Sequence, residues 1–251
     1  DYYLKIIDIN PTLSIVYPII TRFLRDANPS QLNKSKLEKI LNILLERNDV
    51  IHKHLFNIFK FLCSNKILNN LEVLDSDFSK AELIFSDKLI INALKKIIFC
   101  DLRLEKILTK VRRNICDRIA KNIETINYSE LQFIIALGEQ CFLNEYIYSS
   151  TEAEKSSLNI IINKCMNDEL NEKNISILSC YYPLYKLLDQ IPSLKSFNSS
   201  NQSFKELIEL QITEPIKEIE LSKRIKRLGT INNNISLSVK SQYEANPYPR
   251  W

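Results

Sequence analysis

Few residues of this chain have the types and spacing that catalysis or metal binding requires. No two cysteines have the Cys-x-x-Cys spacing of a zinc or redox site; the six are Cys63, Cys100, Cys116, Cys141, Cys165 and Cys180. His52 and His54 are two residues apart, so on a helix they point to different faces and a shared metal is not expected. Nothing specific pairs a cysteine with a histidine base. We therefore predict no metal site, no catalytic residue and buried, reduced thiols typical of a cytoplasmic protein.

Glycine is almost absent, because Gly138 and Gly229 are the only two in 251 residues. Tight hairpins, β-bulges and phosphate-cradling loops use glycine at positive φ. The chain also has no G-x-G-x-x-G motif and no P-loop. This composition predicts an all-α fold that carries no nucleotide pocket of the usual type.

Charge and hydropathy argue against two classes of partner. The net charge is only +4, and acidic and basic residues are interspersed, which is typical of a solvated surface and not of a nucleic-acid interface. Lys95 and Lys96 interrupt the longest apolar candidate before it reaches the roughly 18 residues of a membrane span. We predict neither a nucleic-acid nor a membrane partner.

Three polar residues lie on an otherwise apolar helix that the periodicity predicts from Leu131 to about Tyr146. They are Gln140, Asn144 and Glu145, which are four and five residues apart and share a turn-related face. Such residues can form a buried hydrogen-bond network, or they can contact a ligand or a partner. Both interpretations stay open from the sequence.

The last ten residues hold the only tryptophan of the chain. Pro247 and Pro249 lack an amide donor and push the residues before them toward extended conformations. Aromatic rings in an irregular segment need a surface to pack against. We expect an extended arm that either folds back on its own domain or connects to a second one. Its candidate interdomain contacts are Tyr243, Glu244, Asn246, Tyr248, Arg250 and Trp251.

The same ten residues, QYEANPYPRW, resemble a QYEENPYPRW signature. This signature belongs to a family of bacterial proteins with tetratricopeptide repeats and a class I S-adenosyl-L-methionine (AdoMet)-dependent methyltransferase domain. Ala245 departs from the glutamate of that signature. Residues 101–113 are similar to a D-P-E-L-E-x-x-L-T-x-x-R-R pattern, with Leu102 and Arg103 in place of Pro-Glu.

Two further strings resemble the same family in the same order. Residues 136–148 are similar to A-L-x-x-Q-C-F-x-N-E-Y-V-Y, which precedes T-x-x-E, here Thr151 to Glu154. Residues 213–220 are similar to R-E-P-x-E-E. The resemblance runs from about Asp87 to Trp251, whereas the first 86 residues match only vaguely.

In that family the signature lies between an all-helical region and the methyltransferase domain. The resemblance therefore implies an all-helical accessory domain over 1–230, whose residues 1–86 could end a tetratricopeptide-like array. It implies an extended connector over 231–251 that leads into a methyltransferase domain of the same protein. A start at Asp1 instead of Met agrees with a fragment of a longer protein.

The resemblance implies that the parent protein uses AdoMet, while this chain binds no cofactor itself. The expected function is to position a protein or small-molecule substrate, or another partner, for methyl transfer by the following domain. The alternative is a stand-alone helical adaptor that binds a protein or peptide in a groove.

Hydrophobic periodicity predicts antiparallel helix pairs in a solenoid-like or irregular array. The predicted helices include 35–46, 50–63, 102–116, 131–146, 152–166 and 204–214. Asp87 and Asp101 are predicted N-caps, and Ser129 and Thr151 are predicted to open capping boxes. Pro215 is predicted to end the helix that starts at Phe204.

Overall fold

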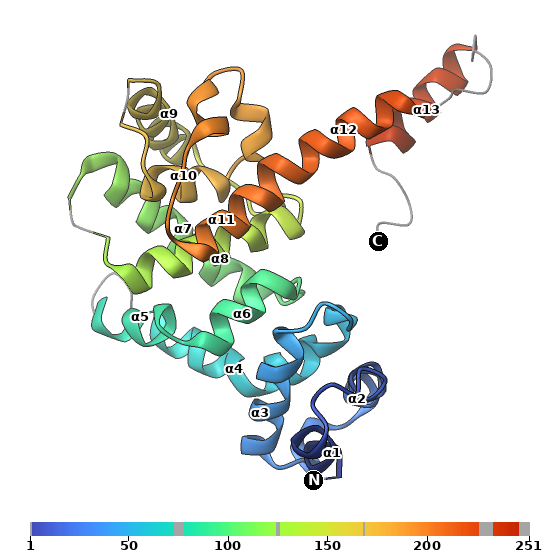
Figure 1. The fold of residues 1–251 in the computed structure, drawn as a ribbon. Helices are drawn as coiled ribbons and strands as arrows, with labels where there is room; N and C mark the ends of the chain where they lie inside the picture. Colours follow the sequence, from blue (N-terminus) through green and yellow to red (C-terminus); the bar gives the residue numbers. More distant parts are fainter. Residues whose placement is uncertain (1, 73–77, 124–125, 168, 226–232, 246–251) are drawn as a thin grey trace. The chain divides into compact units, whose positions relative to one another are not determined.

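The computed structural model describes residues 2–72, 78–123, 126–167, 169–225 and 233–245 (Figure 1). In these ranges all regular secondary structure is helical and no strand occurs, which confirms the all-α prediction. The α-helices are α1 (Tyr2–Ile9), α2 (Val16–Asp26), α3 (Lys34–Leu45), α4 (Phe56–Leu71), α5 (Phe78–Phe85), α6 (Lys88–Lys96), α7 (Leu102–Lys121), α8 (Tyr128–Leu143), α9 (Glu152–Met166), α10 (Glu172–Ser179), α11 (Gln202–Ile208), α12 (Glu214–Arg224) and α13 (Asn234–Ala245).

Shorter helical turns connect several of these elements. They are η1 (Pro29–Gln31), η2 (His52–Leu55), η3 (Leu184–Leu187), η4 (Pro192–Ser196) and the π-helical η5 (Glu209–Thr213). The chain divides into two units, Asp1–Pro215 and Ile216–Trp251, and each is described by itself. None of the described helices combines the length and the apolar run needed to cross a membrane.

Helix α8 lies at the centre of the first unit. It packs against α5, α6, α10 and α11, and 10 of its 16 residues are buried. A helix that is buried on every side needs apolar or internally satisfied residues all round, and its run from Phe133 to Leu137 provides them. In a solenoid each repeat contacts only its neighbours in sequence. The contacts of α8 with helices that are distant in sequence therefore favour an irregular array over a solenoid-like one.

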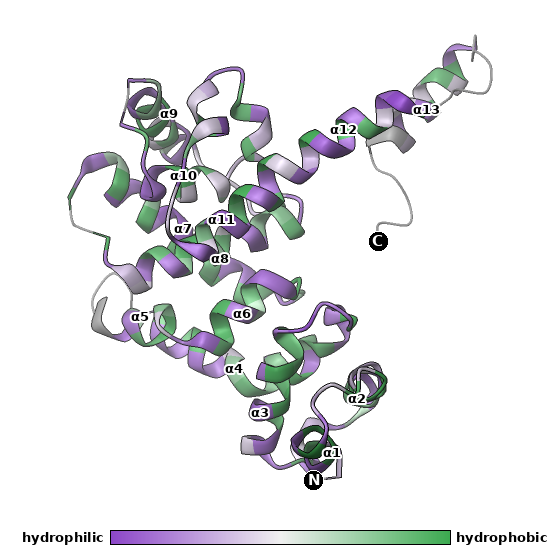
Figure 2. Cartoon of the chain, in the orientation of Figure 1, coloured by the Kyte–Doolittle hydropathy of each residue, from purple (hydrophilic) through white to green (hydrophobic). Residues whose placement is uncertain are grey.

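The apolar core follows the helices of the first unit, where Figure 2 shows hydrophobic residues concentrated along α3, α4 and α8. Phe59, Phe85, Phe133 and Phe204 are fully buried. The rings of Phe85 and Phe133 lie 4.7 Å apart and join α5 to α8. Gly138 allows a close approach of α8 and α10, because a Cβ at this position would lie 2.0 Å from Ser179 Oγ.

Most predicted caps are present. Asp87 Oδ1 accepts from the backbone N–H of Ile90, and Asp101 Oδ1 accepts from those of Arg103 and Leu104. The capping box of Thr151 and Glu154 is complete. The cap predicted at Ser129 is wrong, because Asn127 Oδ1 accepts from Glu130 N at 2.8 Å and starts α8 two residues earlier. Asparagine caps a helix as well as serine does.

The prediction that a helix ends before Pro215 is also wrong. The helix widens into the π turn η5, and the N–H of Glu214 donates to the carbonyl of Glu209, five residues back. Pro215 follows directly and opens the first turn of α12. Since proline has no N–H and is tolerated in the first turn of a helix, the widened turn lets the chain remain helical through it.

The extended arm predicted for 231–251 needs correction over residues 234–245, which form α13. Asn233 Oδ1 accepts from the backbone N–H groups of Ile235 and Ser236 and so provides the N-terminal cap. Pro247 and Pro249 restrict only the residues next to them, so they do not prevent a helix upstream. Residues 246–251 lie outside the described part of the chain.

Candidate functional site

A buried ion pair between Arg112 of α7 and Glu154 of α9 joins four segments of the first unit. Both side chains are 1% exposed, and Arg112 Nη2 lies 3.4 Å from Glu154 Oε1. The same nitrogen donates to the carbonyl of Ser149 at 2.7 Å, and Nη1 donates to that of Cys180 at 3.3 Å. The guanidinium lies 4.0 Å from the ring centroid of Tyr181. One side chain thus connects α7, the α8–α9 turn, α9 and the end of α10.

Hydrogen bonds keep Glu154 ionised in this buried position. Burial alone would raise its pKa, but the N–H and hydroxyl of Thr151, the Tyr181 hydroxyl and Arg113 together lower it. Burial also raises the pKa of Cys116, to about 12, so that thiol is protonated at neutral pH. Glu154 and Arg112 are both buried and paired with each other, which indicates a structural cluster.

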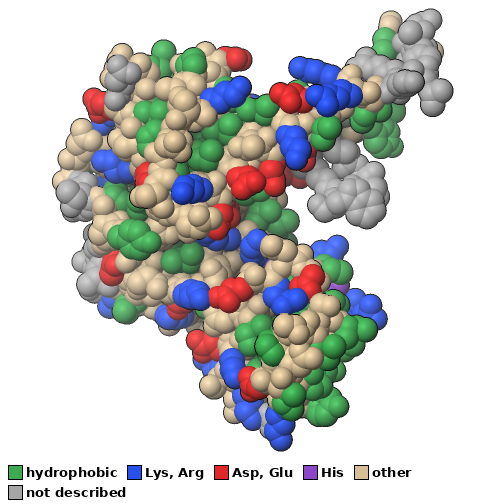
Figure 3. All heavy atoms as spheres, viewed as in Figure 1, with side chains coloured by type: hydrophobic (Ala, Val, Ile, Leu, Met, Phe, Trp, Pro, Cys, Tyr) green, Lys and Arg blue, Asp and Glu red, His purple; other side chains and the backbone are tan. Residues whose placement is uncertain are grey.

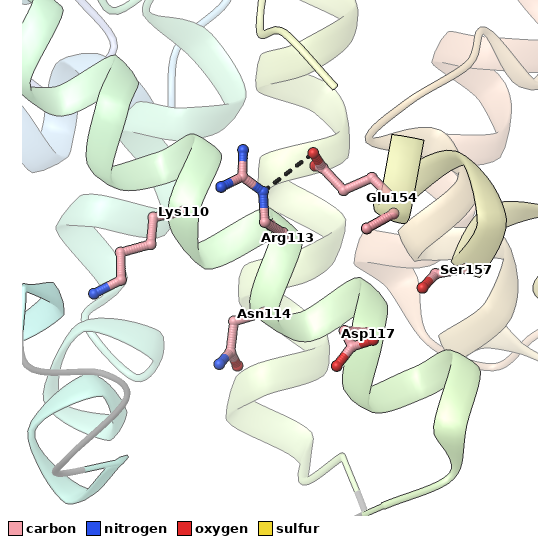
Figure 4. Close-up of a pocket in the computed structure, with 7 residues that line it drawn as sticks. Lys110, Arg113, Asn114, Asp117, Glu154 and Ser157 are labelled. Atoms are coloured by element: carbon pink, nitrogen blue, oxygen red, sulfur yellow. Dashed lines mark hydrogen bonds and ion pairs between the residues drawn. The ribbon is translucent and has the colours of Figure 1, made fainter. Parts of the chain in front are cut away.

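The groove above this cluster has a volume of about 430 Å³ and lies between α7 and α9 (Figure 4). Arg113 Nε reaches Glu154 Oε2 at 3.2 Å, while Lys110 points away from that carboxylate and donates to the carbonyl of Glu72. Asn114, Asp117 and Ser157 complete the polar lining. Its cations are already bonded to the protein, so this groove does not present an assembled reactive centre.

The structure does not bring the three predicted polar residues of α8 into one site. Gln140 is fully buried, and its Oε1 accepts from Phe99 N while its Nε2 donates to the carbonyls of Leu94 and Ile97. Asn144 is the half-buried C-cap of α8, and Glu145 is exposed at φ 60°. Gln140 therefore lies in a buried network that satisfies the end of α6.

A second buried amide, Gln211 of the π turn, was not singled out from the sequence. Its Nε2 donates to the carbonyls of Gly138 and Ser179, and its Oε1 accepts from Tyr146 Oη and Leu184 N. Because all its partners come from distant segments, no local spacing could have revealed it.

Of the predicted interdomain contacts, only Tyr243 has a described side chain. It lies on α13 and is 65% exposed. The side chain of Glu244 and all of Asn246, Tyr248, Arg250 and Trp251 lie outside the described residues.

A cleft in the first unit has a volume of about 840 Å³ and lies where α6, α8 and α11 meet the segment between α3 and η2. Figure 3 shows acidic side chains gathered over α11, next to basic side chains at the end of α6. Its polar lining consists of Glu46, Asn48, His52, Asn92, Lys95, Lys96, Glu139, Glu206, Glu209 and Glu214. We call this surface the α6–α8–α11 cleft.

Glu139 is the buried carboxylate of the α6–α8–α11 cleft and is 6% exposed. Lys95 Nζ lies 3.5 Å from Glu139 Oε1 and 3.1 Å from Glu206 Oε2, so one ammonium is shared by two carboxylates. Burial raises the pKa of Glu139 to about 7, with Glu206 adding to the rise and Lys95 and Lys96 opposing it. This carboxyl is therefore ready to change its charge near neutral pH.

Three buried polar atoms of the cleft have no hydrogen-bond partner within the described structure. They are Glu139 Oε1, Asn92 Nδ2 and His52 Nε2. Burial, followed by the charge of Lys96, lowers the pKa of His52, so its imidazole is neutral at pH 7. Buried polar atoms are nearly always bonded in folded proteins, and a shared cleft lined by three exceptions is a candidate ligand site.

The cleft has the features of a binding site more than those of a catalytic one. The described residues contain no group of three metal-ligating side chains, and no serine or cysteine lines the cleft beside His52. Sequence reasoning missed the cleft because its residues come from four separated segments. Only the i, i+3, i+4 set of Asn92, Lys95 and Lys96 was locally visible.

Comparisons of the chain with protein-family models, with curated proteins and with solved structures find no match.

The two arginines that contact Glu154 allow a matched test of the buried cluster. Arg112 is 1% exposed and Arg113 is 46% exposed. Arg112→Gln leaves a buried carboxylate without its main cation and is expected to lower the free energy of unfolding by roughly 3–5 kcal/mol. Arg113→Gln should cost about 1 kcal/mol or less. Urea unfolding at pH 7 measures both, and equal losses would contradict the structural role given to Arg112.

Glu139 should make stability depend on pH. Since its folded pKa is raised above the unfolded value, the folded state binds more protons between about pH 4.5 and 7, and stability falls as pH rises through that window. The charged groups that face it are Lys95 and Lys96 of α6 and Glu206 of α11. Between pH 5 and 8 the wild-type chain should lose about 2.5 kcal/mol relative to Glu139→Gln, at about 1.4 kcal/mol per pK unit.

Urea unfolding of both proteins at the two pH values measures this difference. Glu209→Gln changes an exposed carboxylate of the same cleft and serves as the control, with the wild-type pH dependence expected. Parallel pH profiles for wild type and Glu139→Gln would show that Glu139 titrates normally.

Proposed function

We propose that this chain is the non-catalytic helical region of an AdoMet-dependent methyltransferase, and that it positions a substrate or partner for methyl transfer by a following domain. The proposal extends the resemblance, and its main support is where the resembling strings lie in the fold. Arg112 and Arg113 end the string 101–113, Gln140 lies within 136–148, and the T-x-x-E pair is Thr151 and Glu154.

These residues take part in two internal networks of the first unit. Arg112, Arg113 and Thr151 all contact Glu154, and Gln140 bonds the end of α6. A helical region that a family shares needs residues that hold its helices together. The contacts of these strings therefore support a common fold, and they assign no chemistry to it.

The residues present do not fit an AdoMet site of the class I type. Such a site uses a strand, a Gly-rich turn and a helix, whereas the described residues contain no strand and the sequence has no Gly-rich turn. In the proposal the cofactor is bound outside this chain, and no step of methyl transfer is assigned to these residues. The six free cysteines, five of them buried, agree with a reducing cytoplasmic location.

An exposed apolar face on α13 supports docking of the following domain. Ile235, Val239 and Tyr243 recur every four residues, so they lie on one side of the helix, and they are 75%, 44% and 65% exposed. In the family that the chain resembles, the methyltransferase domain follows this segment. We propose that this domain covers the face.

The intact parent protein tests both parts of the proposal. It should bind radiolabelled AdoMet, whereas the 251-residue chain should not. In the parent, Ile235→Asp with Val239→Asp should raise the rate of protease cleavage near α13 by about tenfold or more, since burying each side chain contributes about 1.5–3 kcal/mol and 1.4 kcal/mol is a factor of ten. AdoMet binding should stay unchanged.

Ser241→Asp, on the opposite side of α13, is the matched control and should be cleaved at the wild-type rate. A wild-type rate for the double variant would refute docking through this face. A parent protein that fails to bind AdoMet would refute the methyltransferase assignment and leave the adaptor as the better account.

A further inference from the structure

We propose that the α6–α8–α11 cleft binds an organic cation with several N–H donors, namely a primary ammonium or guanidinium group of a free amine or of a basic peptide side chain. The inference rests on the proposed function in one respect, since it identifies this cation as part of the substrate or partner that the chain positions. The binding itself requires only the cleft.

The charge of the cleft favours a cation. Five carboxylates line it against two ammonium groups, so its net charge is negative even when Glu139 is protonated. Lys95 is engaged by Glu139 and Glu206, and Lys96 Nζ lies 3.2 Å from Asn48 Oδ1. An anionic ligand would have to approach several carboxylates while both lysines are already engaged, which is unfavourable.

Two of those carboxylates form no ion pair that would hold the described helices together. Glu209 and Glu214 are exposed, and no described residue forms an ion pair with either. Lys88 pairs with Glu46 at 2.6 Å on another side of the cleft. Uncompensated charge therefore remains along the α11 side, where it can attract a cation.

The unbonded atoms specify which kind of cation fits. Glu139 Oε1 accepts hydrogen bonds. His52 lies within reach of the backbone carbonyls of Leu44 and Arg47, which leaves Nε2 of the neutral ring as an acceptor. Asn92 Nδ2 donates. Ammonium and guanidinium groups carry several N–H donors for the two acceptors, whereas a quaternary ammonium carries none. The Asn92 donor suits a carbonyl or hydroxyl oxygen on the same ligand.

The size of the cleft also limits the ligand. Its volume of about 840 Å³ falls within the roughly 300–1,000 Å³ of small-molecule sites. Such a volume accommodates a diamine or one basic side chain with its flanking peptide groups. Ordered water in place of a ligand is the simplest rival explanation for the unbonded atoms.

Isothermal titration of the 251-residue chain with four probes separates these possibilities. The probes are agmatine, the peptides Gly-Lys-Gly and Gly-Arg-Gly, and butyrate as an anionic control. We expect saturable binding of agmatine or of a peptide with a Kd below about 1 mM, and no binding of butyrate. Preference for the peptides would identify a basic side chain as the ligand, and preference for agmatine would identify a free amine.

Two substitutions test the site itself. Glu139→Gln keeps the shape of the side chain but removes the charged acceptor, and it should weaken binding about tenfold or more. Asn92→Asp exchanges a donor for a charged acceptor, and it should strengthen binding several-fold. Glu38→Gln, an exposed carboxylate on α3 outside the cleft, should bind as the wild-type chain does.

Three results would overturn the inference: no binding of any cation at 10 mM ligand, equal binding of butyrate, or wild-type affinity in Glu139→Gln. The first would leave water as the occupant of the cleft. None of these titrations involves AdoMet, so the cleft can fail this test while the parent remains a methyltransferase, and it can pass if the parent is not one.

Discussion

The first unit depends on the desolvated ion pair of Arg112 and Glu154. A charge removed from water is tolerated only when its partner and hydrogen bonds are in place. Here α7 provides the cation, α9 provides the anion, and the carbonyls of Ser149 and Cys180 bring in the α8–α9 turn and α10. A second pair, Arg118 with Glu130 at 2.5 Å, joins the C-terminal part of α7 to the start of α8. Long-range ionic contacts thus fix the helices around α8.

Two kinds of buried polar group occur in the described residues. Some have all their hydrogen bonds satisfied within the fold, and others have an atom without a hydrogen-bond partner. Gln140 and Gln211 have their donors and acceptors bonded to neighbouring segments, mostly to backbone groups. They specify packing and leave nothing for a ligand. Glu139, next to Gln140 in sequence, faces the α6–α8–α11 cleft. Its Oε1 lies 3.5 Å from Lys95 Nζ but accepts no hydrogen bond, and burial raises its pKa to about 7. Burying a carboxyl without enough hydrogen bonds and charges to compensate it costs stability. A role in binding a ligand explains such a cost, whereas a role in packing does not.

Local features of the sequence predicted much of the fold. Low glycine content and helical periodicity indicated all-α structure, and the caps at Asp87, Asp101 and Thr151 follow from hydrogen bonds within four residues. Pro215 was misjudged because a π turn, which no composition rule signals, carries the helix through it. Helix α13 was not predicted, because the prolines beyond it indicated an extended conformation for the last twenty residues. The cleft was beyond prediction, since Lys95, Glu139 and Glu206 come together only through the packing of α6, α8 and α11.

In this structure the fold buries Glu139 and leaves its Oε1 without a hydrogen bond, next to Lys95, where a cationic ligand could bind. The most direct measurement is a pH titration of the Glu139 carboxyl carbon by NMR in the 251-residue chain, with and without saturating agmatine. We expect a midpoint near pH 7 for the free chain, because burial disfavours the carboxylate. With the cation bound we expect a midpoint at least about one unit lower, because an adjacent positive charge favours the ionised form. A midpoint near the ordinary glutamate value of about 4.3 that agmatine does not move would show that Glu139 is neither desolvated nor part of a cation site.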